Sequence, residues 1–303
     1  MFNSLSVVCR VLQRGSQACG GRGRSHPRWS TLFGPSLLLV LSVYGLLISY
    51  GEAANEKATQ AYSNTCNRAA FRVVVDVGHT AEAPGALSAR GVPEYEFNLR
   101  LARVLEERLL EAGFNSALLV TKGQGRSGLV ERVARANALK ADLFISVHHD
   151  SVPQFLKEGW EYEGRANSFS DRFAGHSIFV SAKNRRQTDS LTFARLLGRE
   201  LKALGLHYTP HYTQSLMGPW QRKLVDAEAG VYRYDQLVVL RTTHMPAVLL
   251  EAGSIVNRDE ELLLASPERQ RLIAASSVKA VEGFCASVHR RRTIMSASRS
   301  LPR

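Results

Sequence analysis

Four residues of this 303-residue chain have the types and the surroundings that metal-assisted hydrolysis requires. They are His79, Glu94, His148 and Glu251, and each lies at the end of an apolar run or at the expected start of a helix. Catalytic zinc sites use three protein ligands drawn from histidine and carboxylate side chains, and they leave a fourth position for water. A further buried carboxylate can accept a proton from that water. The four residues are therefore candidates for a hydrolytic zinc centre.

Each of the four residues has a structural interpretation when it is taken alone. A histidine that follows a strand and a glycine, as His79 does, is often structural, and acids such as Glu94 favour helix N-termini because of the helix dipole. His148 is harder to explain in this way, because the apolar run at 144–147 ends in two histidines and an aspartate. Glu251 ends another apolar run, where a carboxylate must be paired, protonated or catalytic.

The elements expected from hydrophobic patterning bring these residues together. Strands are predicted at 71–77, 116–120, 143–147, 178–181, 237–240 and 247–250, and helices at 95–112, 130–140, 190–203 and 267–288. This alternation predicts a single α/β domain with a mostly parallel twisted sheet and helices on both faces. Ligands of such sheets bind at the C-terminal ends of the strands, where His79, His148 and Glu251 fall. The fold class therefore predicts a zinc site at that edge.

The formal net charge of +12 is concentrated in the two tails. Residues 1–50 hold five arginines and no acid, and residues 290–303 hold five more arginines and no acid. Without these ten, the remaining basic residues nearly balance the 27 acids. We therefore predict no nucleic-acid partner for the folded part, and a basic disordered tail at 290–303.

The N-terminal segment has the pattern of an export signal. Residues 37–50 form an uncharged apolar run, which follows a basic stretch and precedes the small residues at 51–54. The run is shorter than the roughly 20 residues of a transmembrane helix, so residues 1–54 are predicted to be a signal peptide with a basic leader, and a retained signal anchor is the alternative. Residues 55–69 are a predicted linker and 70–289 the catalytic domain. The protein is expected to be periplasmic or otherwise extracytoplasmic, with membrane contact only through an uncleaved leader.

Of the four cysteines, Cys9 and Cys19 lie in the leader, and Cys66 and Cys285 lie near the two ends of the predicted domain. In an oxidising compartment the last two can form a disulfide. Two buried free thiols are the alternative, and the sequence does not choose between them. Their separation excludes a C-x-x-C metal or redox motif.

Five ordered blocks resemble a known family. They are VVVDVGHT at 73–80, APGALSARGVPEYEFNLRLA at 83–102, LLVTKG at 118–123 with LVERVARANALKADLFISVHHD at 129–150, GHSIFVS at 175–181, and PAVLLEAGSIVNRDEE at 246–261. Together they are similar to the zinc-dependent N-acetylmuramoyl-L-alanine amidases, the catalytic domains of bacterial cell-wall amidases. The resemblance covers nearly the whole predicted exported portion.

The resemblance implies that one zinc ion is held by His79, Glu94 and His148, with Glu251 as the catalytic acid and base. Asp76 is expected to orient His79, and a turn-stabilising acid is the alternative. Thr80 replaces the glycine that is usual after the first histidine, and Ser254 stands where an aromatic residue is common. Neither departure falls on a proposed ligand, so both bear on substrate fit rather than on the metal.

The implied reaction is hydrolysis of the amide that joins the lactyl group of N-acetylmuramic acid to L-alanine in peptidoglycan. It would serve cell-wall remodelling or daughter-cell separation, and an activator protein of the division machinery is an implied partner. The alternatives are a non-catalytic peptidoglycan-binding relative, and another zinc amidohydrolase or carboxypeptidase that acts on wall peptides.

Other patterns exclude competing functions. The chain has no H-E-x-x-H motif, and its glycine-rich stretch at 123–128 lacks the Gly-Lys-Ser/Thr of a phosphate loop, so no nucleotide cofactor is expected. Residues 151–175 and 207–235 are predicted to be loops around the site. Their aromatic residues either stack on the substrate or anchor the loops: Trp160, Tyr162, Trp220, Tyr232 and Tyr234.

Overall fold

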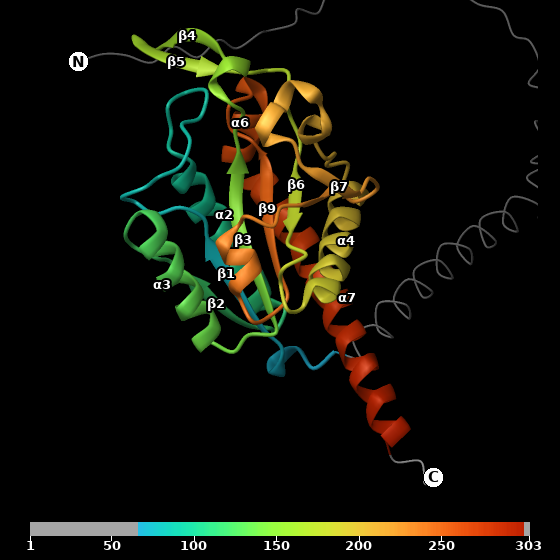
Figure 1. Ribbon diagram of the computed structural model, residues 1–303. Coiled ribbons are helices and arrows are strands. Elements are labelled where there is room, and N and C mark those ends of the chain that lie inside the picture. The colour runs from blue at the N-terminus through green and yellow to red at the C-terminus, as the bar shows by residue number, and fades with distance from the viewer. Residues whose placement is uncertain (1–65, 300–303) are drawn as a thin grey trace, which may run out of the picture. The chain divides into compact units, whose positions relative to one another are not determined.

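The computed structural model describes residues 66–299 (Figure 1). The predicted leader at 1–54 and most of the predicted linker at 55–69 lie outside the described residues. Every described element belongs to one compact unit, Asn55–Arg303. Within residues 66–299 we find no helix with the length and apolarity that a membrane span needs.

A seven-stranded sheet forms the centre of the domain, with strand order β2-β1-β3-β9-β6-β8-β7. Strands β2, β1, β3 and β9 run parallel to one another, whereas β6 runs antiparallel to β9 and β7 runs antiparallel to β8. The strands are β1 (Arg72–Val77), β2 (Asn115–Leu119), β3 (Leu143–Asp150), β6 (Ser177–Val180), β7 (Lys223–Asp226), β8 (Val231–Arg233) and β9 (Ala247–Ser254). The prediction of a mostly parallel sheet is confirmed.

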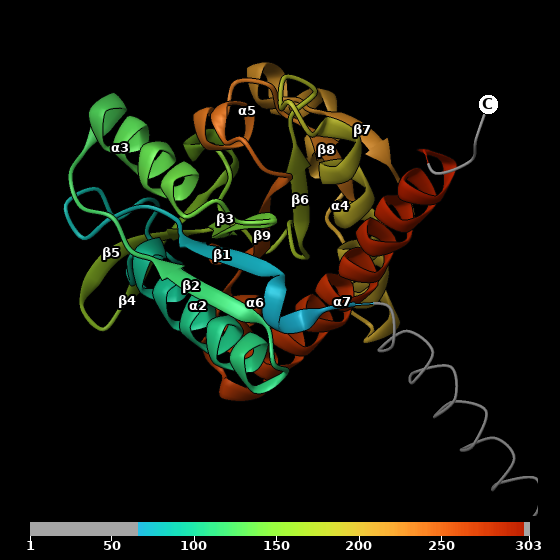
Figure 2. The same cartoon turned by 90° about the horizontal axis from the view of Figure 1, so that it is seen from below.

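Helices cover both faces of this sheet (Figure 2). One face carries α2 (Glu94–Glu111), α4 (Gln187–Ala203), α6 (Arg258–Ala265) and α7 (Pro267–Arg299), and the other carries α3 (Gly125–Ala138) and α5 (Val238–Thr242). Short 3₁₀ helices η1 (Arg68–Ala70), η2 (Gln154–Leu156), η3 (His211–Thr213) and η4 (Ser215–Trp220) lie in the connections. The predicted α/β architecture is confirmed.

The alternation of side chains along the strands decides which residues face the site. Val73, Val75 and Val77 of β1 belong to the core under α2 and α7, where Phe97 and Leu101 are buried one helical turn apart. The residues that alternate with these along the strand point to the opposite face of the sheet, toward α3 and α5. On that face the register pairs Asp76 with Ser146 and Ser146 with Leu249, and one step further along the strands it pairs His148 with Glu251. Two rows of side chains thus lie at the C-terminal end of the sheet. Asp76, Ser146 and Leu249 form the first row, and His148 and Glu251 form the second.

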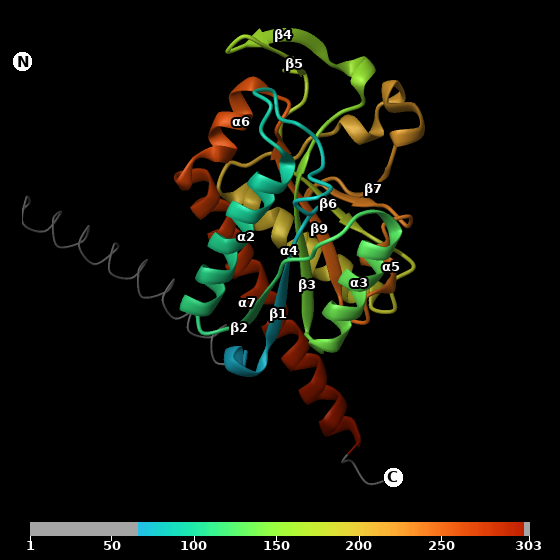
Figure 3. The same cartoon turned by 90° about the vertical axis from the view of Figure 1, so that its left-hand side faces the viewer.

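Two expectations about elements are wrong. Residues 237–240 are not a strand: Leu237 precedes helix α5, in which the Thr242 hydroxyl donates to the carbonyl of Val238. Short apolar runs do not distinguish a strand from a helical turn by periodicity alone. The predicted loops also contain β-structure, namely β7, β8 and the hairpin of β4 (Glu158–Tyr162) and β5 (Arg165–Phe169), which lies at the site end of the molecule (Figure 3).

The predicted disordered tail at 290–303 is also wrong over most of its length. Helix α7 continues through Arg299, and residues 300–303 lie outside the described part. No glycine or proline occurs between Gly283 and Pro302 to end the helix. Arg291 of this extension donates to Asp189 of α4 at 2.7 Å, so the first turn beyond the predicted domain is tied to its surface.

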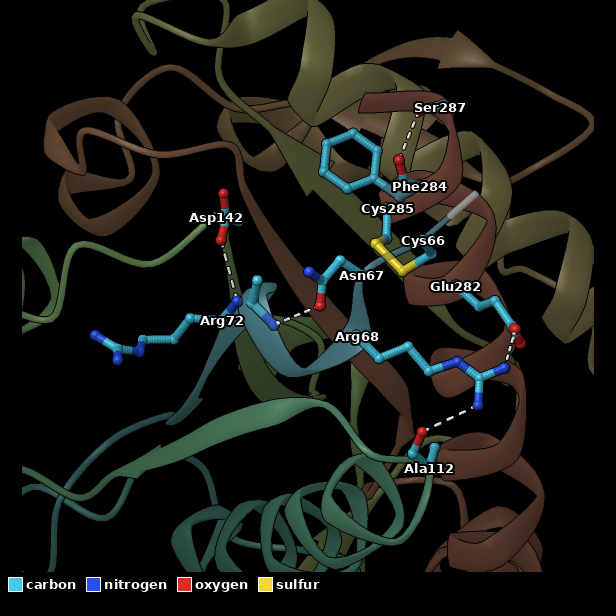
Figure 4. Close-up of a disulfide and its surroundings, with 11 residues drawn as sticks. Cys66, Asn67, Arg68, Arg72, Ala112, Asp142, Glu282, Phe284, Cys285 and Ser287 are labelled. Carbon is cyan, nitrogen blue, oxygen red and sulfur yellow. Dashed lines mark hydrogen bonds and ion pairs between the residues drawn. A yellow bond between two sulfur atoms is a disulfide. The ribbon is translucent and has the colours of Figure 1, made fainter. Parts of the chain in front are cut away.

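Cys66 and Cys285 form a disulfide, which decides between the two alternatives that the sequence left open (Figure 4). The bond joins the start of the described chain to α7 across 219 residues of sequence. Beside it, Arg68 pairs with Glu282 of α7 and donates to the carbonyl of Ala112 at the end of α2. The N-terminal end of β1 is therefore fastened to two helices.

We expect the Cys66→Ser/Cys285→Ser double variant to lose about 3–5 kcal/mol of stability, since cross-linking so long a loop strongly restricts the unfolded chain. For a domain of this size that loss lowers Tm by roughly 10 °C, which thermal unfolding measures. A reducing agent should produce a similar shift in the wild type and none in the variant. A Tm change below about 2 °C in the double variant would contradict the expectation.

Candidate metal centre and active site

The three predicted metal ligands meet at the C-terminal end of the sheet. His79 follows β1, His148 lies near the end of β3, and Glu94 is the first residue of α2. His79 Nε2 lies 3.0 Å from Glu94 Oε2, and His148 Nδ1 lies 3.1 Å from Glu94 Oε1. One ligand atom from each residue falls within 4.8 Å of the others. Two imidazoles and a carboxylate are a donor set that suits a catalytic zinc ion, so the residues fit the implied metal.

Glycines on both sides make room for the ligand rings. A Cβ atom at Gly78 would lie 2.4 Å from Nε2 of His148. At Gly85, a Cβ atom would lie 2.5 Å from Oε2 of Glu94, and the backbone there has a φ of +81°. His79 itself has a φ of 64°, a conformation that is uncommon for a residue with a side chain and that gathers at functional sites. The backbone is therefore shaped around the three ligands.

Glu94 is held by polar groups as well as by the histidines. The side-chain amide of Asn98, one turn along α2, donates to Glu94 Oε1 at 3.2 Å and to the carbonyl of Gly78 at 3.1 Å. The Ala86 amide donates to Glu94 Oε2 at 3.2 Å. Burial raises the pKa of Glu94, but the hydrogen bonds and charges of His148 and His79 outweigh burial and hold the pKa below its ordinary value. These contacts favour the ionised form of the carboxylate, which is the form that binds a metal ion.

His149, the neighbour of His148, faces away from the centre. Its Nδ1 lies 2.8 Å from Oδ1 of Asn98, and its ring packs against Phe97 in the core. Burial lowers its pKa to about 3, so this imidazole is neutral. The structure therefore places His148, and not His149, in the ligand group.

Asp76 does not orient the His79 ring directly. It is fully buried and binds Arg132 Nη1 at 2.8 Å and the Ser146 hydroxyl at 2.7 Å. Arg132 in turn donates to the carbonyls of Val77 and His79. Burial raises the pKa of Asp76, and Arg132 and Ser146 offset only part of this rise. Asp76 thus acts on the backbone at His79 through Arg132, a role that the sequence did not indicate.

We expect Asp76→Ala to destabilise the protein by about 3–5 kcal/mol, because Arg132 would be left buried without its carboxylate. Urea unfolding measures this loss. A matched control is Glu111→Ala, which removes the partner of Arg108 in an exposed pair and should cost about 1 kcal/mol or less. If Asp76→Ala lost as little stability as the control variant, the buried pair of Asp76 and Arg132 would not be what stabilises this edge of the sheet.

Glu251 lies beside the metal ligands on the neighbouring strand. It pairs with His148 in the β3–β9 register, so both side chains leave the same face of the sheet. Its Oε2 atom is buried and has no hydrogen-bond partner among the described residues. Burial raises the pKa of Glu251 well above its ordinary value, and the charges of Asp150 and Glu94 raise the pKa further. A carboxylate with a buried, unpartnered oxygen and a raised pKa is suited to take up and release a proton.

Asp150 and Tyr212 form a buried pair that the sequence did not single out. The Tyr212 hydroxyl, from η3, donates to Asp150 Oδ1 at 2.7 Å. Burial raises the pKa of Asp150 to about 7, although Tyr212 and the Ser151 amide lower it in part. The two residues are 62 positions apart, so no local pattern links them, and only the histidine-rich end of β3 pointed to this region.

Most of the aromatic residues in the predicted loops anchor structure. The Trp160 indole donates to the carbonyl of Ala89 at 2.8 Å and stacks on Tyr162. The hydroxyl of Tyr232, which is buried, donates to the carbonyl of Thr209 at 2.7 Å, and Tyr234 packs under Arg222. Trp220 is 45% exposed and packs against Phe155. The hairpin thus supports the segment that leads to Glu94.

Comparisons with known proteins agree with this geometry. The profile of the N-acetylmuramoyl-L-alanine amidase family matches residues 73–283. The chain is 24% identical over 266 residues to the N-acetylmuramoyl-L-alanine amidase Rv3717 of Mycobacterium tuberculosis, covering 81% of this chain and 98% of that protein. It is 25% identical over 235 residues to the amidase AmiC of Neisseria meningitidis, covering 70% of this chain and 52% of AmiC. The chain thus spans about half the length of AmiC.

Solved structures share the fold. The amidase Ami1 of Mycobacterium smegmatis superposes with a TM-score of 0.56 at 22% identity, covering 73% of this chain and 99% of that one. The catalytic domain of the amidase CwlV of Bacillus (Paenibacillus) polymyxa gives a TM-score of 0.51 at 26% identity, covering 70% and 96%. The matched profile covers more than two thirds of the sequence and includes all four predicted site residues. The chain therefore belongs to the N-acetylmuramoyl-L-alanine amidase family.

Proposed function

We propose that this protein is a zinc-dependent peptidoglycan amidase that hydrolyses the bond between the lactyl group of N-acetylmuramic acid and L-alanine. One observation carries the proposal: His79, Glu94 and His148 offer ligand atoms within 4.8 Å of one another in a domain of this family. The partly buried carboxylate of Glu251 on the adjacent strand supplies the remaining group that such a hydrolysis needs.

Each of these residues has a separate role in the proposed reaction. His79, Glu94 and His148 hold the zinc ion, which when bound makes a water molecule more acidic and polarises the scissile carbonyl. Glu251 accepts the water's proton on its carboxylate and then delivers that proton to the leaving amine of L-alanine. Asn98 and Arg132 keep Glu94 and the His79 backbone in place. The raised pKa of Glu251 supports its use as the proton carrier.

We further propose that the protein is exported and acts in wall remodelling or daughter-cell separation. The basic leader and the apolar run at 37–50 support export, as does the Cys66–Cys285 disulfide, since such bonds persist in oxidising compartments. A solved structure with this fold, at 19% identity and a TM-score of 0.51, is the Clostridioides difficile amidase CwlD in complex with the lipoprotein GerS. An activating partner protein is part of the proposal here.

Product analysis tests the proposed reaction. Residues 55–303, loaded with zinc, are incubated with purified peptidoglycan, and the soluble products are identified by mass spectrometry. The proposal predicts intact stem peptides that begin with a free L-alanine amine. Released terminal amino acids would instead identify a carboxypeptidase, and binding without any product would favour a non-catalytic relative.

A further inference from the structure

A cavity of about 330 Å³ adjoins the metal centre on the α3 and α5 side of the sheet. His79 and His148 are among the residues that line it. The lining also includes Leu129 of α3, Val239 of α5 and Leu249, which lies two residues before Glu251 on β9. The volume is at the lower end of the range for small-molecule sites, so it accommodates a substituent of the substrate.

The lining is suited to uncharged groups. Among the described lining residues, the charged side chains other than the two histidines are Asp76 and Arg132, which are buried and paired with each other. The remaining described lining residues are apolar side chains, glycines and hydroxyls, and the Thr80 hydroxyl already donates to the carbonyl of Gly123. A stem peptide carries free carboxylates, and the described lining residues offer no unpaired cationic side chain for them. Methyl and acetyl groups fit it better.

The position of Glu251 decides which side of the scissile amide faces the cavity. Glu251 has to reach the leaving amine of L-alanine, and it does not line the cavity. His79 and His148 do line it, and in the proposed function these two residues hold the metal that polarises the carbonyl. This arrangement favours a substrate whose acyl side lies toward the cavity and whose amine side lies toward Glu251.

We propose that this cavity is the subsite for the acyl side of the substrate, and that it takes the lactyl methyl and the N-acetyl group of muramic acid. The inference rests on the proposed amidase function and adds the direction in which the substrate binds. Thr80, where this chain departs from the glycine usual in the family, lines the subsite together with Leu129 and Val239. These three side chains then determine how well the sugar side is recognised.

A cavity-filling variant tests this subsite. Leu129→Trp places a large ring at the cavity wall from a position that is 39% exposed, so the fold tolerates it. Val130→Trp is the matched control, because Val130 is the next residue of α3, is 56% exposed and does not line the cavity. Both changes are made in the full chain, and zinc content and Tm are checked against the wild type.

Three soluble substrates separate the two sides of the amide: N-acetylmuramyl-tetrapeptide, N-acetylmuramyl-L-alanine, and D-lactyl-tetrapeptide, which lacks the sugar. We expect Leu129→Trp to lower kcat/KM about tenfold or more for both muramyl substrates and to change it less than twofold for the lactyl peptide. Val130→Trp should change none of them by more than twofold. An equal loss on all three substrates, a loss confined to the tetrapeptides, or no loss would overturn the assignment.

A binding measurement keeps this inference separate from the proposed function. Calorimetry with N-acetylmuramic acid should detect binding to the zinc-loaded wild type and to Val130→Trp, and at least tenfold weaker binding to Leu129→Trp. If the wild type cleaved none of the three substrates, the amidase proposal would fail while this measurement still decided on the subsite. Equal affinity in all three proteins, or binding to none of them, would reject the subsite.

Discussion

Glu251→Gln is expected to lower the rate of peptidoglycan cleavage by about 10²–10⁴-fold while zinc remains bound. Glutamine has nearly the shape of glutamate, so the β9 position next to His148 stays filled. It cannot accept the proton of the attacking water, however, nor return a proton to the leaving amine. Turnover is measured with purified peptidoglycan, and zinc content by elemental analysis of the same protein.

Glu260→Gln is the matched control for this change. Glu260 is a buried glutamate whose carboxylate accepts hydrogen bonds from the backbone amides of Gly175 and Ser254. Its replacement should reduce stability and leave turnover within a few-fold of the wild type. Cleavage by Glu251→Gln at a near wild-type rate would refute the assignment of Glu251 as the proton carrier.

His148→Ala is expected to abolish both zinc binding and cleavage. Three protein ligands are the minimum in catalytic zinc sites, and this change leaves only His79 and Glu94. It also removes the ring whose Nδ1 lies 3.1 Å from Glu94. Zinc stoichiometry after dialysis and product formation from peptidoglycan are the two measurements, and both should fall to background.

The adjacent histidine provides the control. His149→Asn keeps a donor near the position of Nδ1, which contacts Asn98, and His149 faces the core rather than the metal group. We expect this variant to bind one zinc ion and to retain activity, with some loss of stability. If His149→Asn lost the metal and His148→Ala kept it, the two histidines would have to exchange roles.

Much of the site was predictable because its residues interrupt strong local patterns. The valine-rich run before Gly78 and the apolar run before His148 identify buried parallel strands, and polar residues at the ends of such strands are conspicuous. Glu94 could be placed only by the family resemblance, since an acid at a helix N-terminus is common. Its two oxygens in fact face the two histidine rings.

The parts that were not predicted depend on contacts between distant segments. Arg132 reaches the carbonyl of His79 across 53 residues, and Tyr212 reaches Asp150 across 62. The spacing and the periodicity of residues in the sequence indicate neither of these two contacts. Helix α5 was mistaken for a strand because five residues show no helical period, and the cavity that it walls was missed with it. The disulfide was an open alternative because sequence alone does not show whether two cysteines meet.

Zinc titration of the metal-free protein tests the central claim most directly. Residues 55–303 are stripped with a chelator, zinc is added in steps, and the release of stem peptides with a free L-alanine amine is followed at each step. We expect no product without metal, and a rate that rises until one zinc ion is bound per chain. Undiminished cleavage by the metal-free protein, or full zinc loading of a His79→Ala/His148→Ala variant, would contradict this claim.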